Sequence, residues 1–193
     1  MNATVAMTDY RRNRIHPKKF ALLIACASIT MMFAAFTSAY VVRQAAGNWL
    51  EFRLPDLFYM NTGVILLSSL SLHSSYLAFK RGNTRLYRLL LAGALILGLA
   101  FLALQYQAWQ ALAAIGVELT TNPSGSFVYV ISGVHAAHIL GGIAVLILAA
   151  LHAFVLPHRI TPTRKLRFEL TLIYWHFVDF LWVYLLLFFT FQS

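Results

Sequence analysis

The stretch Tyr174-Trp175-His176-Phe177-Val178-Asp179-Phe180-Leu181-Trp182 decides the fold, because it places two ionisable side chains inside a long apolar segment. No lysine or arginine follows Arg167, and apolar residues dominate from 168 to 191. A hydrophobic run of this length is typical of a membrane-spanning helix. His176 and Asp179 lie one helical turn apart within it. Ionisable groups are costly at membrane depth and usually face protein, so this helix is predicted to pack against other helices.

The composition places the whole chain in the membrane class. Of its 193 residues, 60% are hydrophobic and 11% are charged, whereas soluble domains have about 25% charged residues. The net charge of +9 is attributed to basic residues that flank membrane helices on the cytoplasmic side, so no nucleic-acid partner is predicted. Cys26 stands alone in the chain, which excludes an intramolecular disulfide.

Apolar runs long enough to cross a bilayer occur five times in the chain. They cover about residues 20–42, 57–79, 87–114, 126–156 and 168–191. Thirteen of the fifteen basic residues fall on one side of the resulting topology. This asymmetry predicts a cytoplasmic N-terminus and a periplasmic C-terminus. The expected fold is therefore all-α, a polytopic bundle of five transmembrane helices that forms a single membrane domain over residues 1–193.

The fourth run carries a second polar group and a stripe of small residues. Gly133, Ala137 and Gly141 recur every fourth residue, a spacing that lets membrane helices approach closely. His135 and His138 are three residues apart and share a helix face.

Counting residues along the fourth and fifth helices predicts two polar layers between them. At 1.5 Å per residue, the histidines of the fourth helix lie level with those of the fifth, near the middle of the membrane. The upper layer would contain His135, His138, His176 and Asp179, and the lower one His152 and Glu169. His73 is expected to make a polar contact near the inner interface.

These residues leave three interpretations open. Histidines on facing helices are the residue type that holds haem or copper in membranes, and carboxylates with histidines are plausible proton-relay groups. The simpler interpretation is that they hydrogen-bond one another between helices. No catalytic constellation is visible, which fits an accessory subunit of a larger membrane complex.

Several motifs resemble those of subunit III of the haem–copper oxidases. Residues 174–179, followed by Trp182, resemble its C-terminal Tyr-Trp-His-Phe-Val-Asp signature. Residues 132–138 resemble the family's Thr-Gly-Phe-His-Gly-Leu-His run, and Glu169 matches a glutamate at the start of the last helix. Asn61-Thr62 and Leu104-Gln105 also fit. The resemblance covers all five helices and is to the five-helix bacterial form.

The resemblance implies a subunit that holds no haem or copper itself, since these groups belong to partner subunits. It would pack on subunit I, work with subunit II, bind phospholipid and support proton uptake and turnover stability in a bacterial inner membrane. A respiratory supercomplex is a further partner that the resemblance suggests. Its polar ties and lipid-cleft residues would be His135, His138, His152, Glu169, Trp175, His176 and Asp179. Cytochrome c is the preferred electron donor and quinol the alternative; a small haem-binding or transport protein is the alternative from another class.

Two positions depart from the family pattern. Ile29 stands where the family commonly has a buried carboxylate, so a proton-related role of that group is not carried over. His152 stands where many members have an arginine at a lipid phosphate. A weaker lipid contact is expected there.

Overall fold

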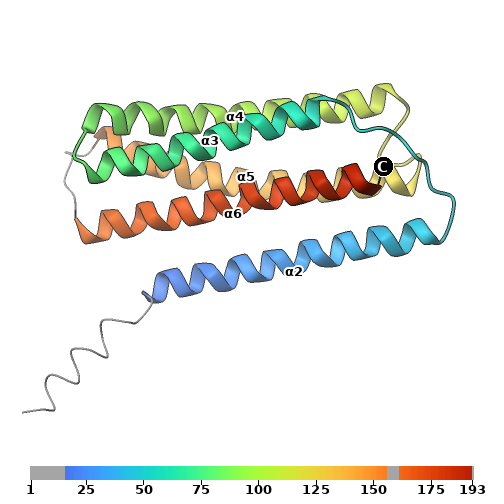
Figure 1. Cartoon of the computed structure of the whole chain (residues 1–193), viewed down its shortest axis with the longest axis horizontal. Coiled ribbons are helices and arrows are strands. Elements are labelled where there is room, and N and C mark those ends of the chain that lie inside the picture. The colour runs from blue at the N-terminus through green and yellow to red at the C-terminus, as the bar shows by residue number, and fades with distance from the viewer. Residues whose placement is uncertain (1–15, 156–160, 193) are drawn as a thin grey trace, which may run out of the picture.

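The computed structural model describes residues 16–155 and 161–192, which form five long helices and no strand. The helices are α2 (Pro17–Ala45), α3 (Leu57–Lys80), α4 (Thr84–Ala114), α5 (Pro123–Val155) and α6 (Pro162–Gln192). Each is long and apolar enough to cross a membrane, and consecutive helices run in opposite directions (Figure 1). The predicted all-α bundle of five membrane helices is confirmed.

Proline residues set where three of the helices begin. Pro17, Pro123 and Pro162 each occupy the first position of a helix, where a residue without an N–H group loses no hydrogen bond. As a result α5 and α6 begin earlier than the expected starts at 126 and 168. Between α3 and α4, Gly82 adopts a positive φ of 76°, and the Asn83 side chain caps α4 by accepting from the Leu86 N–H group.

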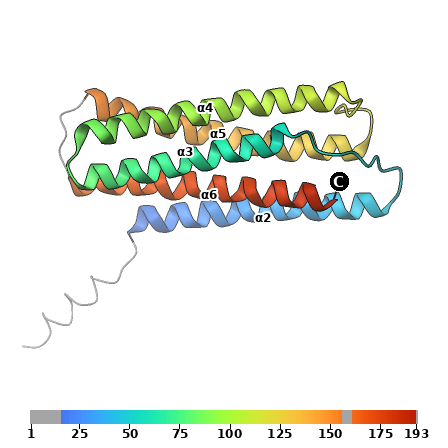
Figure 2. The same cartoon turned by 45° about the horizontal axis from the view of Figure 1, so that its top comes forward.

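A ladder of serines joins α3 to α4. The hydroxyl groups of Ser68, Ser71 and Ser75 donate to backbone carbonyl groups of α4 at 2.8, 2.8 and 2.9 Å. Small hydroxylated residues allow close approach of membrane helices and satisfy their own polar groups at the same time. In contrast, α2 packs only against α5 and α6 and lies apart from the α3–α4 pair (Figures 1 and 2).

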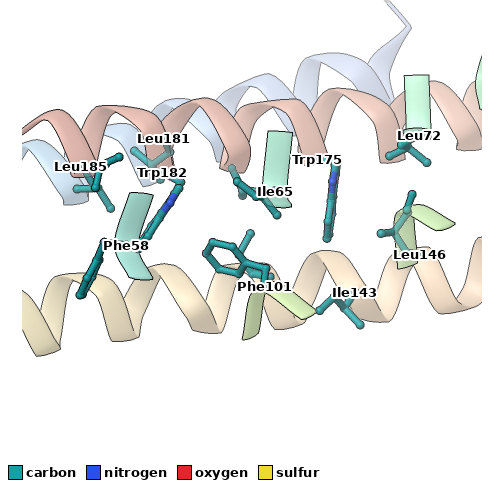
Figure 3. Packing of buried hydrophobic residues seen from close by; sticks show 14 of the residues in the cluster. Phe58, Ile65, Leu72, Phe101, Ile143, Leu146, Trp175, Leu181, Trp182 and Leu185 are labelled. Carbon is teal, nitrogen blue, oxygen red and sulfur yellow. The ribbon is translucent and has the colours of Figure 1, made fainter. Parts of the chain in front are cut away.

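The core is centred on two tryptophans of α6. Trp175 and Trp182 are completely buried, and Figure 3 shows both indoles pointing from α6 toward α5, with Phe101 of α4 between them. Trp175 fits between two glycines: a Cβ atom at Gly98 or at Gly142 would lie 2.9 Å from the indole ring. Helices α4, α5 and α6 therefore meet where glycine leaves room for one large ring.

Candidate functional site

A charged cluster ties α6 to α2 and α3 at the end of the bundle where α2 begins. The Glu169 carboxylate lies 2.6 Å from the Lys19 ammonium group and 3.9 Å from that of Lys165. It also accepts a hydrogen bond of 2.7 Å from the Tyr76 hydroxyl group. We refer to Lys19, Tyr76, Lys165 and Glu169 as the basic-end cluster.

The predicted lower layer of Glu169 with His152 is wrong. His152 is exposed, and its Nδ1 atom lies 2.7 Å from the carbonyl oxygen of Leu148 in its own helix. Both residues lie at the same end of the bundle, as counting predicted. Glu169, however, is turned toward α2 and α3, where Lys19 and Tyr76 supply its partners.

A second polar cluster lies between α3 and α6, closer to the middle of the helices. The Ser69 hydroxyl group is 2.5 Å from Nδ1 of His176, and Nε2 of His176 is 3.4 Å from Nδ1 of His73. Asp179 lies one turn further along α6 and is 5% exposed. We call Ser69, His73, His176 and Asp179 the seam cluster.

The seam cluster corrects the predicted upper layer, because His176 binds α3 instead of α5. The Nδ1 atom of His138 lies 2.8 Å from its own helix's Val134 carbonyl oxygen. The tie between α5 and α6 at this depth comes from Tyr174, whose hydroxyl group donates to the His138 carbonyl oxygen at 3.1 Å.

His135 lies in an aromatic box and not in a polar layer. Its ring stacks on Trp182 with centroids 5.0 Å apart and meets Phe101 and Phe33 edge-on. The residue is completely buried, and neither ring nitrogen has a hydrogen-bond partner among the described residues. Within this chain His135 therefore acts as a flat packing group.

The stripe of small residues on α5 does not make the close helix contacts expected of it within the chain. Ala137 is exposed, and a Cβ atom at Gly133 or Gly141 would meet no atom closer than 4.0 or 3.8 Å respectively. The close contacts are those of Gly98 and Gly142 with Trp175. Gly98 and Gly142 are visible in the sequence, but the spacing of glycines alone does not show which side of a helix contacts a large ring.

A cavity of about 790 Å³ lies mainly between α2, α5 and α6, at the same end as the basic-end cluster, and Phe79 of α3 and Tyr87 of α4 also line it. Basic groups from three helices line it, namely Lys18, Arg164, Arg167 and His152, and the remaining wall is mainly apolar. Of the predicted cleft residues only His152 lines it, together with Gly141 of the packing stripe. His135, Trp175 and Asp179 are buried in the bundle instead.

The cationic residues of the cavity were missed as site residues, because in the sequence they counted only toward topology. In the described ranges, no three histidine, cysteine or acidic side chains converge in a geometry that could hold a metal ion. The arrangement offers two kinds of chemistry: a cationic, apolar-walled cavity and hydrogen-bonded clusters of titratable groups.

Comparison with known proteins assigns these features to a family. The family described as "Cytochrome c oxidase subunit III" matches residues 19–193. The chain is 28% identical over 177 residues to "Probable cytochrome c oxidase subunit 3" of Nocardia farcinica, covering 89% of this chain and 86% of the relative. It is 28% identical over 189 residues to "Cytochrome c oxidase subunit 3" of Thermostichus vulcanus, covering 94% and 90%.

A third relative is named as a subunit of a ubiquinol oxidase and not of a cytochrome c oxidase. "Cytochrome bo(3) ubiquinol oxidase subunit 3" of Buchnera aphidicola is 26% identical over 170 residues, covering 86% of this chain and 89% of the relative. The family match spans all five membrane helices and both polar clusters. This multi-pass membrane chain therefore belongs to the cytochrome c oxidase subunit III family of the haem–copper oxidases.

Proposed function

We propose that the chain is the accessory third subunit of an aerobic terminal oxidase that takes electrons from cytochrome c. The observation that carries this proposal is the family match over residues 19–193, together with relatives named as cytochrome c oxidase subunits. In this proposal the chain packs on subunit I and works with subunit II. Haem and copper reside in those partner subunits, and oxygen is reduced to water there.

A quinol oxidase is the second candidate, favoured by the relative named as a subunit of a ubiquinol oxidase. In both candidates the electron donor binds another subunit, so the helices of this chain are compatible with either kind of oxidase. The proposed location is the inner membrane of a bacterium. The end with Lys19, Lys80 and Lys165 would face the cytoplasm, because basic residues gather there.

The proposed role of the cavity is to hold a phospholipid. A phospholipid carries an anionic phosphate and apolar chains, and the cavity combines basic groups at one end with an apolar wall. Lys18, Arg164 and Arg167 would contact the phosphate. A lipid bound there would fill the space between α2 and the α5–α6 pair, which supports the proposed contribution to turnover stability.

Purification through a tag on this chain in mild detergent tests the main proposal. We expect haem-containing subunit I and a subunit II with a copper centre to copurify, as identified by mass spectrometry and visible absorption. A haem–copper subunit I with a subunit II that lacks the copper centre would transfer the proposal to a quinol oxidase. Absence of any haem–copper subunit, or a haem retained by the separated chain, would contradict it.

Lipid retention tests the cavity separately. Mass spectrometry of the purified complex should show about one fewer phospholipid per subunit III after combined replacement of Lys18, Arg164 and Arg167 by glutamine. Arg81→Gln is the matched control, since Arg81 is exposed at the same end and does not line the cavity. Equal lipid retention in both variants would contradict the lipid role.

A further inference from the structure

The cavity between α2, α5 and α6 carries positive charge on two of its walls. Lys18, Arg164 and Arg167 line it. Lys18 comes from the first turn of α2, and the two arginines come from the first two turns of α6. An ammonium group and a guanidinium group are hydrogen-bond donors without any acceptor. A polar group bound at this end of the cavity therefore meets cationic donors from two helices.

Acidic side chains lie elsewhere in the part of the chain that the structure describes. This part contains five of them, and none of the five lines the cavity. Glu51, Asp56 and Glu118 lie in the connections at the opposite end of the bundle. Asp179 is buried among the helices. The described lining can therefore attract an anion, but it offers no carboxylate to pair with a cation.

Glu169, the fifth acidic side chain, lies at the same end as the cavity but is already paired. Its carboxylate is 2.6 Å from the Lys19 ammonium group and accepts a hydrogen bond of 2.7 Å from the Tyr76 hydroxyl group. The residues on either side of it in the sequence, Phe168 and Leu170, line the cavity, whereas Glu169 does not. Its negative charge is therefore used between α6, α2 and α3 and not at the cavity lining.

The apolar wall of the cavity indicates what kind of anion fits there. Leu22, Val145 and Leu148 belong to this wall, and Val145 and Leu148 are 40% and 55% exposed. A free phosphate ion has no apolar part that could pack against them. A phospholipid packs its acyl chains there while its phosphate remains beside the cations. The occupant argued for is therefore a lipid and not a free anion.

We propose that the cavity selects a phospholipid with a net anionic headgroup over one with a zwitterionic headgroup. Both kinds carry a phosphate that the cations can bind. Phosphatidylethanolamine adds an ammonium group, which the three cations repel and which no carboxylate of the described lining accepts. Phosphatidylglycerol adds hydroxyl groups instead, which need no opposite charge. This inference rests on the proposed lipid role of the cavity and adds the charge of the headgroup to it.

Competition between two lipids tests this selection. The assembled oxidase, purified through a tag on this chain, is equilibrated with equal amounts of phosphatidylglycerol and phosphatidylethanolamine that have the same acyl chains. Mass spectrometry then counts the lipids that each complex retains. The combined variant Lys18→Gln, Arg164→Gln and Arg167→Gln is treated in the same way, and the difference from the wild type is the cavity's share. In that share phosphatidylglycerol should exceed phosphatidylethanolamine by about tenfold, because the attraction of an anionic lipid increases with each basic residue.

His152→Glu tests the same argument in the opposite direction, because it adds a carboxylate to the lining. His152 is exposed and contacts only its own helix through Nδ1, so the replacement leaves the core unchanged. Phosphatidylethanolamine should then be retained at least as well as phosphatidylglycerol. Arg81→Gln is the matched control, since it also lowers the formal net charge by one at the same end but does not line the cavity. It should retain the wild-type ratio of the two lipids.

The possible failures of these experiments are distinguishable. Equal amounts of the two lipids in the cavity's share would overturn the selection, although the lipid role would stand. A wild-type lipid ratio in His152→Glu would also overturn it, because a lining carboxylate would then have no influence on the headgroup. Equal lipid content in the wild type and the combined variant would contradict the lipid role itself. Absence of haem–copper subunits from the preparation would contradict the proposed function.

Discussion

Two faces of α6 hold the bundle together in different ways. One face projects Trp175 and Trp182 among α3, α4 and α5, where glycines and aromatic rings pack against the two indoles. The other face presents Glu169 and His176 to α3 through hydrogen bonds, and Glu169 also forms an ion pair with Lys19 of α2.

The difference shows how one helix can be held without the hydrophobic driving force that acts in water. Lipid chains are as apolar as the side chains they touch, so helices associate through packing and hydrogen bonds. Loss of a large buried ring removes many packing contacts at once. A hydrogen bond in the membrane contributes less to stability than expected, because its groups find other partners in the unfolded state. The packing face should therefore dominate stability, and the polar face is free to have another role.

Trp175→Ala is the strongest test of this comparison. It empties the slot between Gly98 and Gly142 and should lower the free energy of unfolding by about 3–5 kcal/mol, the usual range for a buried tryptophan. Titration of the subunit in mixed detergent micelles with dodecyl sulfate measures this change. Phe180→Ala is the control, since Phe180 is 75% exposed on the same helix. An equal loss in both variants would contradict the packing role of the slot.

The sequence alone predicted the helices and the level of each polar residue along them, but it did not predict which helices lie next to one another. Residue counting placed His138 level with His176 and His152 at the same end as Glu169, and these levels follow directly from helix geometry. Residue counting did not show that α6 lies between α2, α3 and α5. A polar residue on α6 can therefore find its partner on any of these three helices. His176 and Glu169 both turn toward α3, away from the expected partners on α5.

Short local bonds explain the remaining differences. His138 and His152 each meet the carbonyl oxygen four residues earlier in their own helix. Such bonds satisfy a polar side chain without any neighbouring helix, so a histidine in a membrane helix need not indicate an interhelical tie. The position of His135 in an aromatic box also depends on Phe33, Phe101 and Trp182 coming together from three helices, which no local pattern encodes.

On the polar face, Glu169→Ala should have the largest effect. It removes the ion pair with Lys19 and the bond from Tyr76, and the expected loss is about 1.5–2 kcal/mol, the lower part of the range for charged hydrogen bonds because the site is partly exposed. The same detergent titration measures it. Lys165→Ala is the control with an expected loss below about 0.5 kcal/mol, because Lys165 is 3.9 Å away and half exposed. Equal losses would show that the Lys19 and Tyr76 contacts do not stabilise the bundle.

His176→Phe should cost less, although it disrupts the whole seam cluster. The ring loses its contacts with Ser69 and His73, and membrane hydrogen bonds contribute about 0.6 kcal/mol each on average. The expected loss in the detergent titration is about 1 kcal/mol. A loss as large as that of Trp175→Ala would remove the distinction between the packing and polar faces of α6.

His135→Phe should have the smallest effect and separates the two kinds of buried histidine. Since neither ring nitrogen of His135 bonds another described residue, a phenyl ring of similar shape loses no hydrogen bond within the chain. It also keeps the stack on Trp182. The free energy of unfolding should change by no more than about 0.5 kcal/mol in either direction, because volume-conserving exchanges are the best tolerated in cores. A loss equal to that of His176→Phe would mean that His135 is held by hydrogen bonds after all, and that the aromatic box is not what stabilises it.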